Sequence, residues 1–510
     1  MGIKNIEFEA NQGNVEALVK LGRIYLEGMG VDPDYKKAHS YFSKAAHEDN
    51  AQAFAYLAYM NAYGLGVERS DEKVVKYFEK AFELNDAYSG FALGFVYKKG
   101  LYGEDKDPDK AREYFEKAAS MGISGAKYEQ ALILEKDAKR LSESSDAQDR
   151  QKAQELKPKA LSLFKEAAND NYVPAKYALA VKYLNENNPQ KDKEAFNLLD
   201  SSKDSGIALV YYALAFCYDY AKGCEQDFFK AFDYYQQAYE AGYKKAIMNI
   251  AYAYLTGCGC GQNYRKAIDI CRDAVNGGIQ EANFFAALCF ENGLGVDQDY
   301  EKAIQLYGFA QQAGYMPAFM KTGQMYDPYY GIGGDESGAK EEYEKAAELG
   351  SIDAKAELAK LSYDEDPKAK LDELTKLAAE GSSTANEIIG TLYKDGRGVA
   401  KDEAKALEYY KKAADNGSQK AAKEIIAIAT EKQDKALLVK YGDKLFTFKT
   451  PKDYFNRAKV LQEDGEAERA AFWYAMAGLS TIKEDNTLRA EQAIKDNFEK
   501  GPNGYWSAKK

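Results

Sequence analysis

The sequence predicts an all-α protein, a right-handed α-solenoid of about 12–13 two-helix repeats with roughly 36 residues each. Three observations lead to this fold class. Apolar side chains recur at the three-to-four-residue spacing of a helix face. A block of two such helices around a glycine-rich turn returns along the chain at a nearly constant step. Proline, which interrupts helices, is scarce at 10 of 510 residues.

The clearest copy of this block lies at residues 385–417. Ala385, Ile389 and Tyr393 are four residues apart and therefore share one face of a first helix. The glycines of the DGRG segment end that helix, because glycine adopts turn conformations that a Cβ atom disfavours. Asp402 then stands where an N-cap or first-turn acid belongs. The apolar face of the second helix follows at Ala406, Tyr409, Tyr410, Ala413 and Ala414.

The block recurs in register along the chain. The aromatic position near the end of each first helix serves as a marker, and successive markers are 36 residues apart. The marker positions are Tyr25, Asn61 and Tyr97 at the start, and Tyr218, Tyr254, Phe290 and Tyr326 in the middle. A two-helix unit of this length cannot bury its apolar face alone, so neighbouring units are expected to stack and share one hydrophobic core.

The recurring pattern is A-x3-L-G-x2-Y-x2-G-x-G-V-x2-D-x2-K-A-x2-Y-Y-x-K-A-A-x2-G, with good copies at residues 17–46 and 282–314. It resembles the Sel-one-like repeat, a branch of the tetratricopeptide repeat superfamily. The resemblance is clear over residues 10–420 and loose over 421–480. It implies a repeat solenoid at 1–420, followed at 421–510 by degenerate repeats and a C-terminal capping helix. This last helix is expected at 486–499.

Three departures from the repeat carry their own expectations. A polar insertion at about 136–157 is charged and helix-prone, which predicts extended helices in a protruding hairpin; a solvated loop is the alternative. The fifth repeat has NENNPQKDKEA in place of the glycine turn, and the tenth is shortened around SYDEDPKAK. The superhelix is expected to bend or change pitch at these two places.

Charge and hydropathy exclude several classes of partner. The net charge of −12 argues against nucleic acid, since proteins that bind it need a basic footprint. No apolar run approaches the roughly 18–20 residues that span a bilayer, so no membrane insertion is expected. The N-terminal segment lacks an apolar signal core, which predicts a cytoplasmic protein. A periplasmic or secreted protein whose signal peptide has been removed is the alternative, and the oligomeric state stays open.

The cysteines predict packing, with neither a metal site nor a cofactor. Five of the six occupy positions of small buried hydrophobic residues, and Cys258 in the GCGCG segment is the exception: Cys217, Cys224, Cys258, Cys260, Cys271 and Cys289. Zinc sites usually need four ligands with thiolates spaced C-x2-4-C, and His39 and His47 are far away in sequence. Unpaired thiols favour a reducing compartment.

The sequence predicts no catalytic residues. Neither histidine has a paired nucleophile in a known motif. Some cysteine-rich relatives in the family are described as β-lactamase-like, and Ser70-x-x-Lys73 and Lys321-Thr322-Gly323 formally match serine-enzyme motifs. Ser70 stands at an expected N-cap, however, and Thr322-Gly323 at the Leu-Gly position of a first helix. A β-lactamase-like or peptidoglycan-related activity and a purely structural spacer remain the alternatives to a binding protein.

An aromatic stripe on the first helices supplies the candidate binding residues. It has two columns, six and two residues before the marker, which are four residues apart and share a face. Its aromatic members are Tyr59, Phe91, Phe95, Tyr128, Tyr177, Tyr212, Phe216, Tyr252 and Phe284. In superhelical relatives the first helices line the concave surface, so the resemblance implies a scaffold or adaptor that binds a partner protein or peptide there. The same stripe has a second interpretation, as hydrophobic core between repeats, and the sequence leaves both open.

Overall fold

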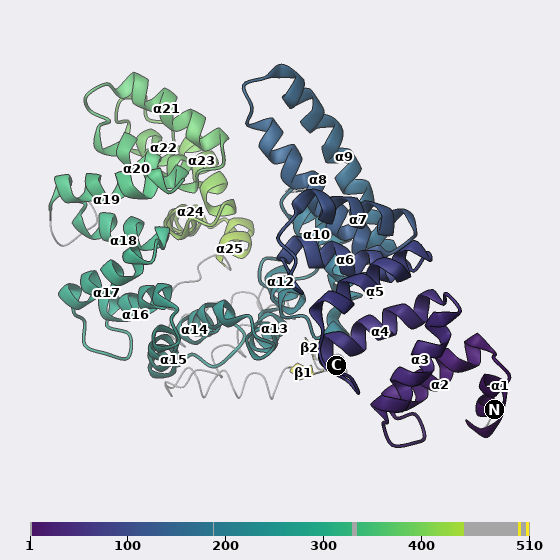
Figure 1. The fold of residues 1–510 in the computed structure, drawn as a ribbon. Helices are drawn as coiled ribbons and strands as arrows, with labels where there is room; N and C mark the ends of the chain where they lie inside the picture. Colours follow the sequence, from purple (N-terminus) through teal and green to yellow (C-terminus); the bar gives the residue numbers. More distant parts are fainter. Residues whose placement is uncertain (1–2, 187, 329–333, 443–497, 501–505, 509–510) are drawn as a thin grey trace. The chain divides into compact units, whose positions relative to one another are not determined.

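The computed structural model describes residues 3–186, 188–328 and 334–442, together with two short strands at 498–500 and 506–508 (Figure 1). The chain divides into two compact units, Met1–Ser205 and Gly206–Lys510. The first unit contains α1 (Ile3–Asn11), α2 (Val15–Glu27), α3 (Tyr35–His47), α4 (Ala51–Tyr63), α5 (Asp71–Glu83), α6 (Ala87–Lys99), α7 (Pro108–Ser120), α8 (Ser124–Ser142), α9 (Ala147–Asn169), α10 (Val173–Leu184), α11 (Pro189–Asp200) and the 3₁₀ turn η1 (Lys203–Ser205).

The second unit continues the same alternation of helices. It contains α12 (Ala208–Asp219), α13 (Phe228–Glu240), η2 (Lys244–Ala246), α14 (Ile247–Thr256), α15 (Tyr264–Asn276), η3 (Gln280–Ala282), α16 (Asn283–Asn292), α17 (Tyr300–Gln312), α18 (Met316–Tyr326), α19 (Glu336–Glu348), α20 (Ile352–Leu361), α21 (Pro367–Ala379), α22 (Ser383–Asp395), α23 (Glu403–Asp415), α24 (Gln419–Glu431), α25 (Lys435–Gly442), β1 (Phe498–Lys500) and β2 (Trp506–Ala508).

The predicted all-α repeat fold is confirmed. In the described part of the chain, α2 to α25 form twelve consecutive helical hairpins, and within each unit a helix packs against the next helix in sequence. Each hairpin is one repeat, with an even-numbered first helix and an odd-numbered second helix. Among the described helices, none is both long enough and apolar enough to cross a lipid bilayer.

A short antiparallel sheet departs from the helical pattern. Strand β1 pairs with β2 so that Phe498 lies opposite Ala508 and Lys500 opposite Trp506. The helix expected at 486–499 lies outside the described residues except for its last two, and these are in β1 rather than in a helix.

The acid, lysine and marker aromatic of the repeat form one local structure. Asp402 is the N-cap of α23, and its side chain accepts a hydrogen bond of 3.0 Å from the backbone N–H of Lys405. The Lys405 ammonium lies 5.1 Å from the ring centroid of Tyr393, within the range of a cation–π interaction. The same arrangement recurs with the N-cap, lysine and marker sets Asp34, Lys37, Tyr25; Asp227, Lys230, Tyr218; Asn263, Lys266, Tyr254; and Asp299, Lys302, Phe290.

Glycine in the Leu-Gly pair of the first helix allows the two helices of a hairpin to approach closely. A Cβ atom on Gly22 would lie 2.5 Å from the Phe42 ring, and one on Gly390 would lie 2.8 Å from the Tyr410 ring. Both rings are buried, with at most 1% of their surface exposed. The second helix therefore fills its core position with a whole aromatic ring, because the first helix has no side chain there.

The polar insertion lies in the α8–α9 hairpin, whose helices are 19 and 23 residues long. Figure 1 shows both helices extending past their neighbours α7 and α10. Ala138 and Ala153, in the extended part, are buried with 1% of their surface exposed. Arg112 of α7 and Asp137 of α8 form an ion pair of 2.8 Å. The inserted residues are thus largely helical, and small side chains let the two long helices pack together.

Candidate partner-binding surface

The two columns of the aromatic stripe have different surroundings. In the column six residues before the marker, side chains contact the following repeat. Tyr128 lies 5.6 Å from Tyr172, Tyr212 lies 4.7 Å from Tyr243, and Phe284 lies 5.2 Å from Tyr315, measured between ring centroids. Each of these partners precedes the first helix of the next repeat. This geometry matches the second interpretation of the stripe, packing between repeats.

The remaining two members of this column, Phe91 and Tyr177, are half-buried. The Phe91 ring reaches the next first helix, because a Cβ atom on Gly125 of α8 would lie 2.6 Å from it. It also lies 6.0 Å from Phe115, a fully buried ring on α7. Phe91 therefore contacts both the core of its own hairpin and the next repeat. Like Tyr128, Tyr212 and Phe284, it packs between repeats.

The column two residues before the marker is more open. Tyr59 is 45% exposed and Tyr252 is 39% exposed, while Phe95 and Phe216 are half-buried. Phe95 lies 5.3 Å from the buried ring of Phe115 and so also supports the core. These four residues keep aromatic surface available to solvent on the first helices.

Two tyrosines outside the predicted stripe extend this open column. Tyr63 is 67% exposed and lies 4.7 Å from Tyr59, and Tyr220 is 59% exposed and lies 4.7 Å from Phe216. Each follows its partner by four residues, and this helical spacing was the signal that could have identified it. We define the first-helix surface as Tyr59, Tyr63 and Phe95 in the first unit and Phe216, Tyr220 and Tyr252 in the second.

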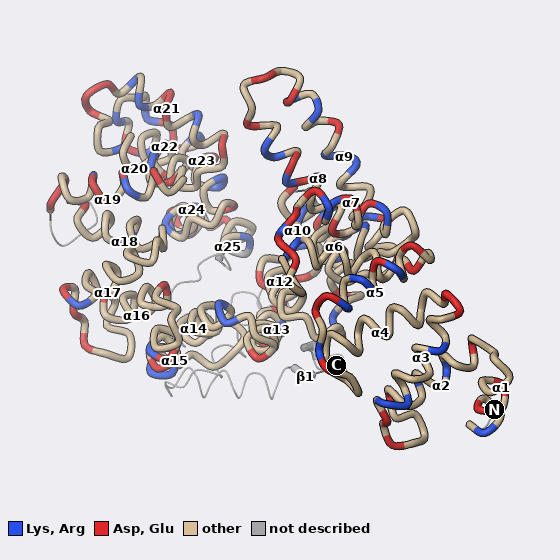
Figure 2. Tube along the Cα trace, viewed as in Figure 1, with Lys and Arg blue, Asp and Glu red and all other residues tan. Residues whose placement is uncertain are grey.

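Ion pairs link the first helices of successive repeats. They join a lysine in one repeat to a glutamate in a neighbouring one: Lys98–Glu129, Lys182–Glu135, Lys321–Glu291, Lys394–Glu424 and Lys420–Glu387. Figure 2 shows acidic and basic residues interspersed in both units. Charges that pair within the chain contribute little net field to a partner. The exposed aromatic side chains therefore distinguish this surface more than its charge does.

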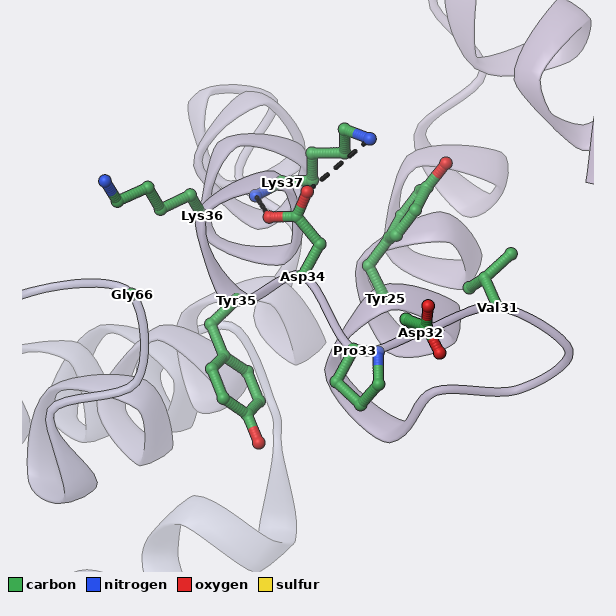
Figure 3. Close-up of a pocket in the computed structure, with 9 residues that line it drawn as sticks. All are labelled: Tyr25, Val31, Asp32, Pro33, Asp34, Tyr35, Lys36, Lys37 and Gly66. Carbon is green, nitrogen blue, oxygen red and sulfur yellow. Dashed lines mark hydrogen bonds and ion pairs between the residues drawn. The ribbon is translucent and has the colours of Figure 1, made fainter.

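A pocket of about 610 Å³ lies at the turn of the first repeat (Figure 3). Its lining residues are Tyr25, Val31, Asp32, Pro33, Asp34, Tyr35, Lys36, Lys37 and Gly66. Asp34 accepts the backbone N–H of Lys37 at 3.0 Å and pairs with the Lys37 ammonium at 3.5 Å. The side chains of Tyr35 and Lys36 point away from Asp34 in Figure 3. The polar groups of this pocket stabilise the repeat turn, and they do not converge on a common point where a ligand would bind.

The hydroxyl groups of the serine-enzyme motifs form hydrogen bonds with the backbone of their own helices. The Ser70 hydroxyl caps α5 by accepting the backbone N–H of Lys73. Thr322 lies on α18, and its hydroxyl donates a hydrogen bond of 3.0 Å to the carbonyl of Ala318. Ser70 therefore occupies the N-cap position that the sequence predicts for it.

None of the six cysteines forms a disulfide in the structure. Burial raises the pKa of Cys224 to about 11, and it raises the pKa values of Cys260, Cys271 and Cys289 to about 12. Such thiols are protonated at neutral pH and are therefore poor nucleophiles and poor metal ligands. Within the described ranges, no cluster of three or more His, Cys, Asp or Glu side chains could hold a metal ion.

These thiols are expected to resist alkylation in the folded protein. With iodoacetamide at pH 8, Cys271 and Cys289 should react at least about tenfold more slowly than in urea-unfolded protein, because the thiolate is the reacting form. Peptide mass spectrometry after a timed quench measures the modification at each site. Rapid labelling of Cys271 in the folded chain would contradict its burial.

Comparison with known proteins gives a consistent family match. The model of the Sel1 repeat matches eight segments, residues 15–50, 51–86, 88–123, 208–243, 244–272, 280–315, 330–351 and 385–418. The unmatched stretch from 124 to 207 contains the long α8–α9 hairpin and the repeat without a glycine turn. A search of curated protein sequences gives no match.

Several solved structures are similar to this chain. A protective antigen of uropathogenic Escherichia coli, which displays an SLR fold, is 19% identical, with 97% of this chain and 95% of that chain covered and a TM-score of 0.35. A Sel1 repeat protein from Oxalobacter formigenes is 22% identical, with 70% and 89% covered and a TM-score of 0.28. Yeast Tom70 is 13% identical, with 95% of each chain covered and a TM-score of 0.26.

Proposed function

This chain belongs to the Sel1 repeat family, and from that premise we propose that it is a non-catalytic scaffold or adaptor that binds a partner protein or peptide on its first-helix surface. Sel1 and tetratricopeptide-like repeats generally mediate protein–protein interaction. Beyond this general role, we propose the first-helix surface as the binding site and place it on the concave side of the repeat array. The partner's identity stays open.

One observation supports the choice of surface above the others. The stripe divides into a column that packs between repeats and a column that keeps Tyr59 and Tyr252 exposed, and Tyr63 and Tyr220 enlarge the second column. Large aromatic side chains dominate the energetics of protein interfaces. They gain most when a partner removes them from water, and here they stand on rigid helices that need little ordering on binding.

We also propose that the protein acts in a reducing compartment, the cytoplasm. None of its six cysteines forms a disulfide, and four of them have pKa values raised by burial. Proteins that reside in oxidising compartments more often pair their thiols as disulfides. Cell fractionation with an antibody against the chain tests this location, and recovery in the periplasm or the medium would contradict it.

The binding proposal predicts that a Tyr59→Ala, Phe216→Ala, Tyr252→Ala variant loses its partner but stays folded. Phe95 is left unchanged because its ring contacts the buried Phe115. Removing three anchors of this kind should weaken binding at least about a hundredfold, since single hot-spot residues contribute about 2 kcal/mol or more. Crosslinking mass spectrometry in the native cell, which maps the partner to residues of this chain, measures the loss.

A matched control separates binding from general loss of aromatic surface. The Tyr35→Ala, Tyr300→Ala, Phe309→Ala variant removes three exposed rings from second helices. We expect its crosslinks to equal those of the unmodified chain. Equal loss of crosslinks in both variants, or a collapse of the thermal midpoint in the first variant alone, would show that the named residues do not form a dedicated binding surface.

A further inference from the structure

Two acidic residues that follow a marker aromatic are paired with a lysine from the next repeat. Glu291 follows the marker Phe290, and its carboxylate lies 3.1 Å from the ammonium of Lys321 on the next first helix. Asp327 follows the marker Tyr326 and lies 2.9 Å from the ammonium of Lys360. In these repeats the chain therefore supplies both the acid and the cation.

The Glu291 site contains a third group. The hydroxyl of Tyr307, on the second helix of the same hairpin, donates a hydrogen bond to the Glu291 carboxylate. A tyrosine from the second helix and a lysine from the next repeat thus hold one carboxylate between them. The Glu291 side chain is only 17% exposed, so both partners compensate for its lost hydration.

Asp219 reproduces this site without the lysine. It follows the marker Tyr218 at the end of α12, and it accepts a hydrogen bond of 3.0 Å from the hydroxyl of Tyr235 on α13. In the described part of the chain, no Lys or Arg lies within ion-pair distance of its carboxylate. Lys321 follows Glu291 by thirty residues, and Asn249 stands thirty residues after Asp219. A neutral side chain thus occupies the position of the pairing lysine.

The Asp219 carboxylate stands next to Tyr220, one of the exposed rings of the first-helix surface. Burial raises the pKa of Asp219 to about 6, with the hydrogen bond from Tyr235 opposing the shift. Burial also raises the pKa of Tyr220, and the negative charge of Asp219 raises it further, so the two groups lie close together. Tyr220 directly follows Asp219 in the chain, and Tyr252 stands three residues after Asn249 on α14, one helical turn along the same face. Asp219, Tyr220 and Tyr252 are therefore treated as one cluster on the first-helix surface of the second unit.

We propose that this cluster binds a lysine or arginine side chain of the partner, with the Asp219 carboxylate as the ion-pair acceptor and the rings of Tyr220 and Tyr252 around the hydrocarbon stem. The inference rests on the proposed function, because it specifies the partner chemistry of the same surface. Hydrogen bonds between oppositely charged groups are stronger than neutral ones, and aromatic rings attract cations. The partner's cation takes the position that Lys321 takes beside Glu291.

Binding of two synthetic peptides to the full chain tests the inference. The first is acetyl-Leu-Tyr-Lys-Leu-Gly-amide, and the second has norleucine, an uncharged residue of similar length, in place of lysine. Calorimetry at pH 7 should show that the lysine peptide binds about tenfold more tightly, the effect of one charge-assisted pair. Equal affinity for the two peptides, or no measurable binding of the lysine peptide, would overturn the inference.

Three variants identify the site. Asp219→Asn keeps an acceptor for the Tyr235 hydroxyl. This variant should bind the lysine and norleucine peptides about equally well, and its thermal midpoint should not fall. Asn249→Lys supplies the cation from within the chain, so it should raise the midpoint and also remove the preference. Asp297→Asn removes an exposed charge from the same unit and should leave the preference unchanged. A lysine preference that survives in the Asp219→Asn and Asn249→Lys variants would assign the cation to another acid.

The same variants separate this inference from the proposed function. The unmodified chain could show no preference for the lysine peptide while crosslinks to the partner still map to the first-helix surface. That result would reject only the cation site. Crosslinks that map to other surfaces of the chain would reject the binding surface itself.

Discussion

Replacing Phe115 by alanine is expected to lower the free energy of unfolding by about 3–5 kcal/mol, the usual cost of removing a fully buried phenylalanine. The ring has 0% exposure and contacts Phe91 and Phe95 of the first helix. It also packs against Gly94, whose missing side chain leaves the space that the ring fills. Urea unfolding followed by circular dichroism measures the loss.

An exposed aromatic residue of the same hairpin provides the control for Phe115. Tyr88 on α6 is 72% exposed, and Tyr88→Ala should change the free energy of unfolding by no more than about 0.5 kcal/mol. Equal losses in the two variants would mean that Phe115 is not a core residue. A loss at Phe115 well below about 2 kcal/mol would mean that the hairpin collapses easily into the vacated space.

Replacing Gly66 by alanine should cost about 2–4 kcal/mol, because two penalties add. Gly66 has a positive φ of 72°, which a residue with a Cβ atom adopts at a cost. Its Cβ atom would also lie 2.5 Å from the backbone carbonyl of Tyr35, at the start of α3 in the preceding repeat. The obstructing atoms belong to the backbone, so relief requires the second repeat to move away from the first.

Gly30 isolates the first of these penalties, the backbone cost. It occupies the same turn position in the first repeat with a φ of 76°, and a Cβ atom added to it would meet nothing within 4 Å. Gly30→Ala should therefore cost only about 1 kcal/mol, the backbone contribution. Equal destabilisation of the two variants would show that the turn glycines do not hold successive repeats together.

Local features of the repeat were predictable from sequence because they depend on residues close together in the chain. The N-cap at Asp402 and the glycine turn after Asp395 require only helix capping and turn chemistry, and both are present in the structure. The helices at residues 136–157 likewise follow from local composition. A hairpin of 36 residues encodes its own two helices, so its periodicity alone identified the fold.

The candidate surface was only half predictable, because burial depends on where the next repeat lies. Tyr128 and Tyr59 belong to the same sequence stripe, yet Tyr128 contacts the following repeat and Tyr59 is open to solvent. The column six residues before the marker meets the following repeat, whereas the column four residues later on the same helix is more open to solvent. The missing cation at Asp219 could be recognised only once Lys321 was found beside Glu291, since thirty residues separate that pair.

The division into units at Ser205 and Gly206 was also absent from the sequence prediction. The repeat pattern predicts one array over residues 1–420, and its helical signal continues on both sides of the division. A pattern of helix faces specifies which side chains are buried, but not how extensively one hairpin packs against the next. We therefore propose partner binding separately for Tyr59, Tyr63 and Phe95 in the first unit and for Phe216, Tyr220 and Tyr252 in the second.

All of these inferences require that each hairpin be stabilised by its neighbours in sequence order. Hydrogen–deuterium exchange of the Phe115→Ala variant, resolved by peptide mass spectrometry, is the decisive measurement. We expect faster exchange in α4 to α9, the mutated repeat and the repeats on either side of it, and unchanged exchange in α16 to α23. Uniformly faster exchange over the whole chain, or a change confined to α6 and α7, would contradict nearest-neighbour stacking.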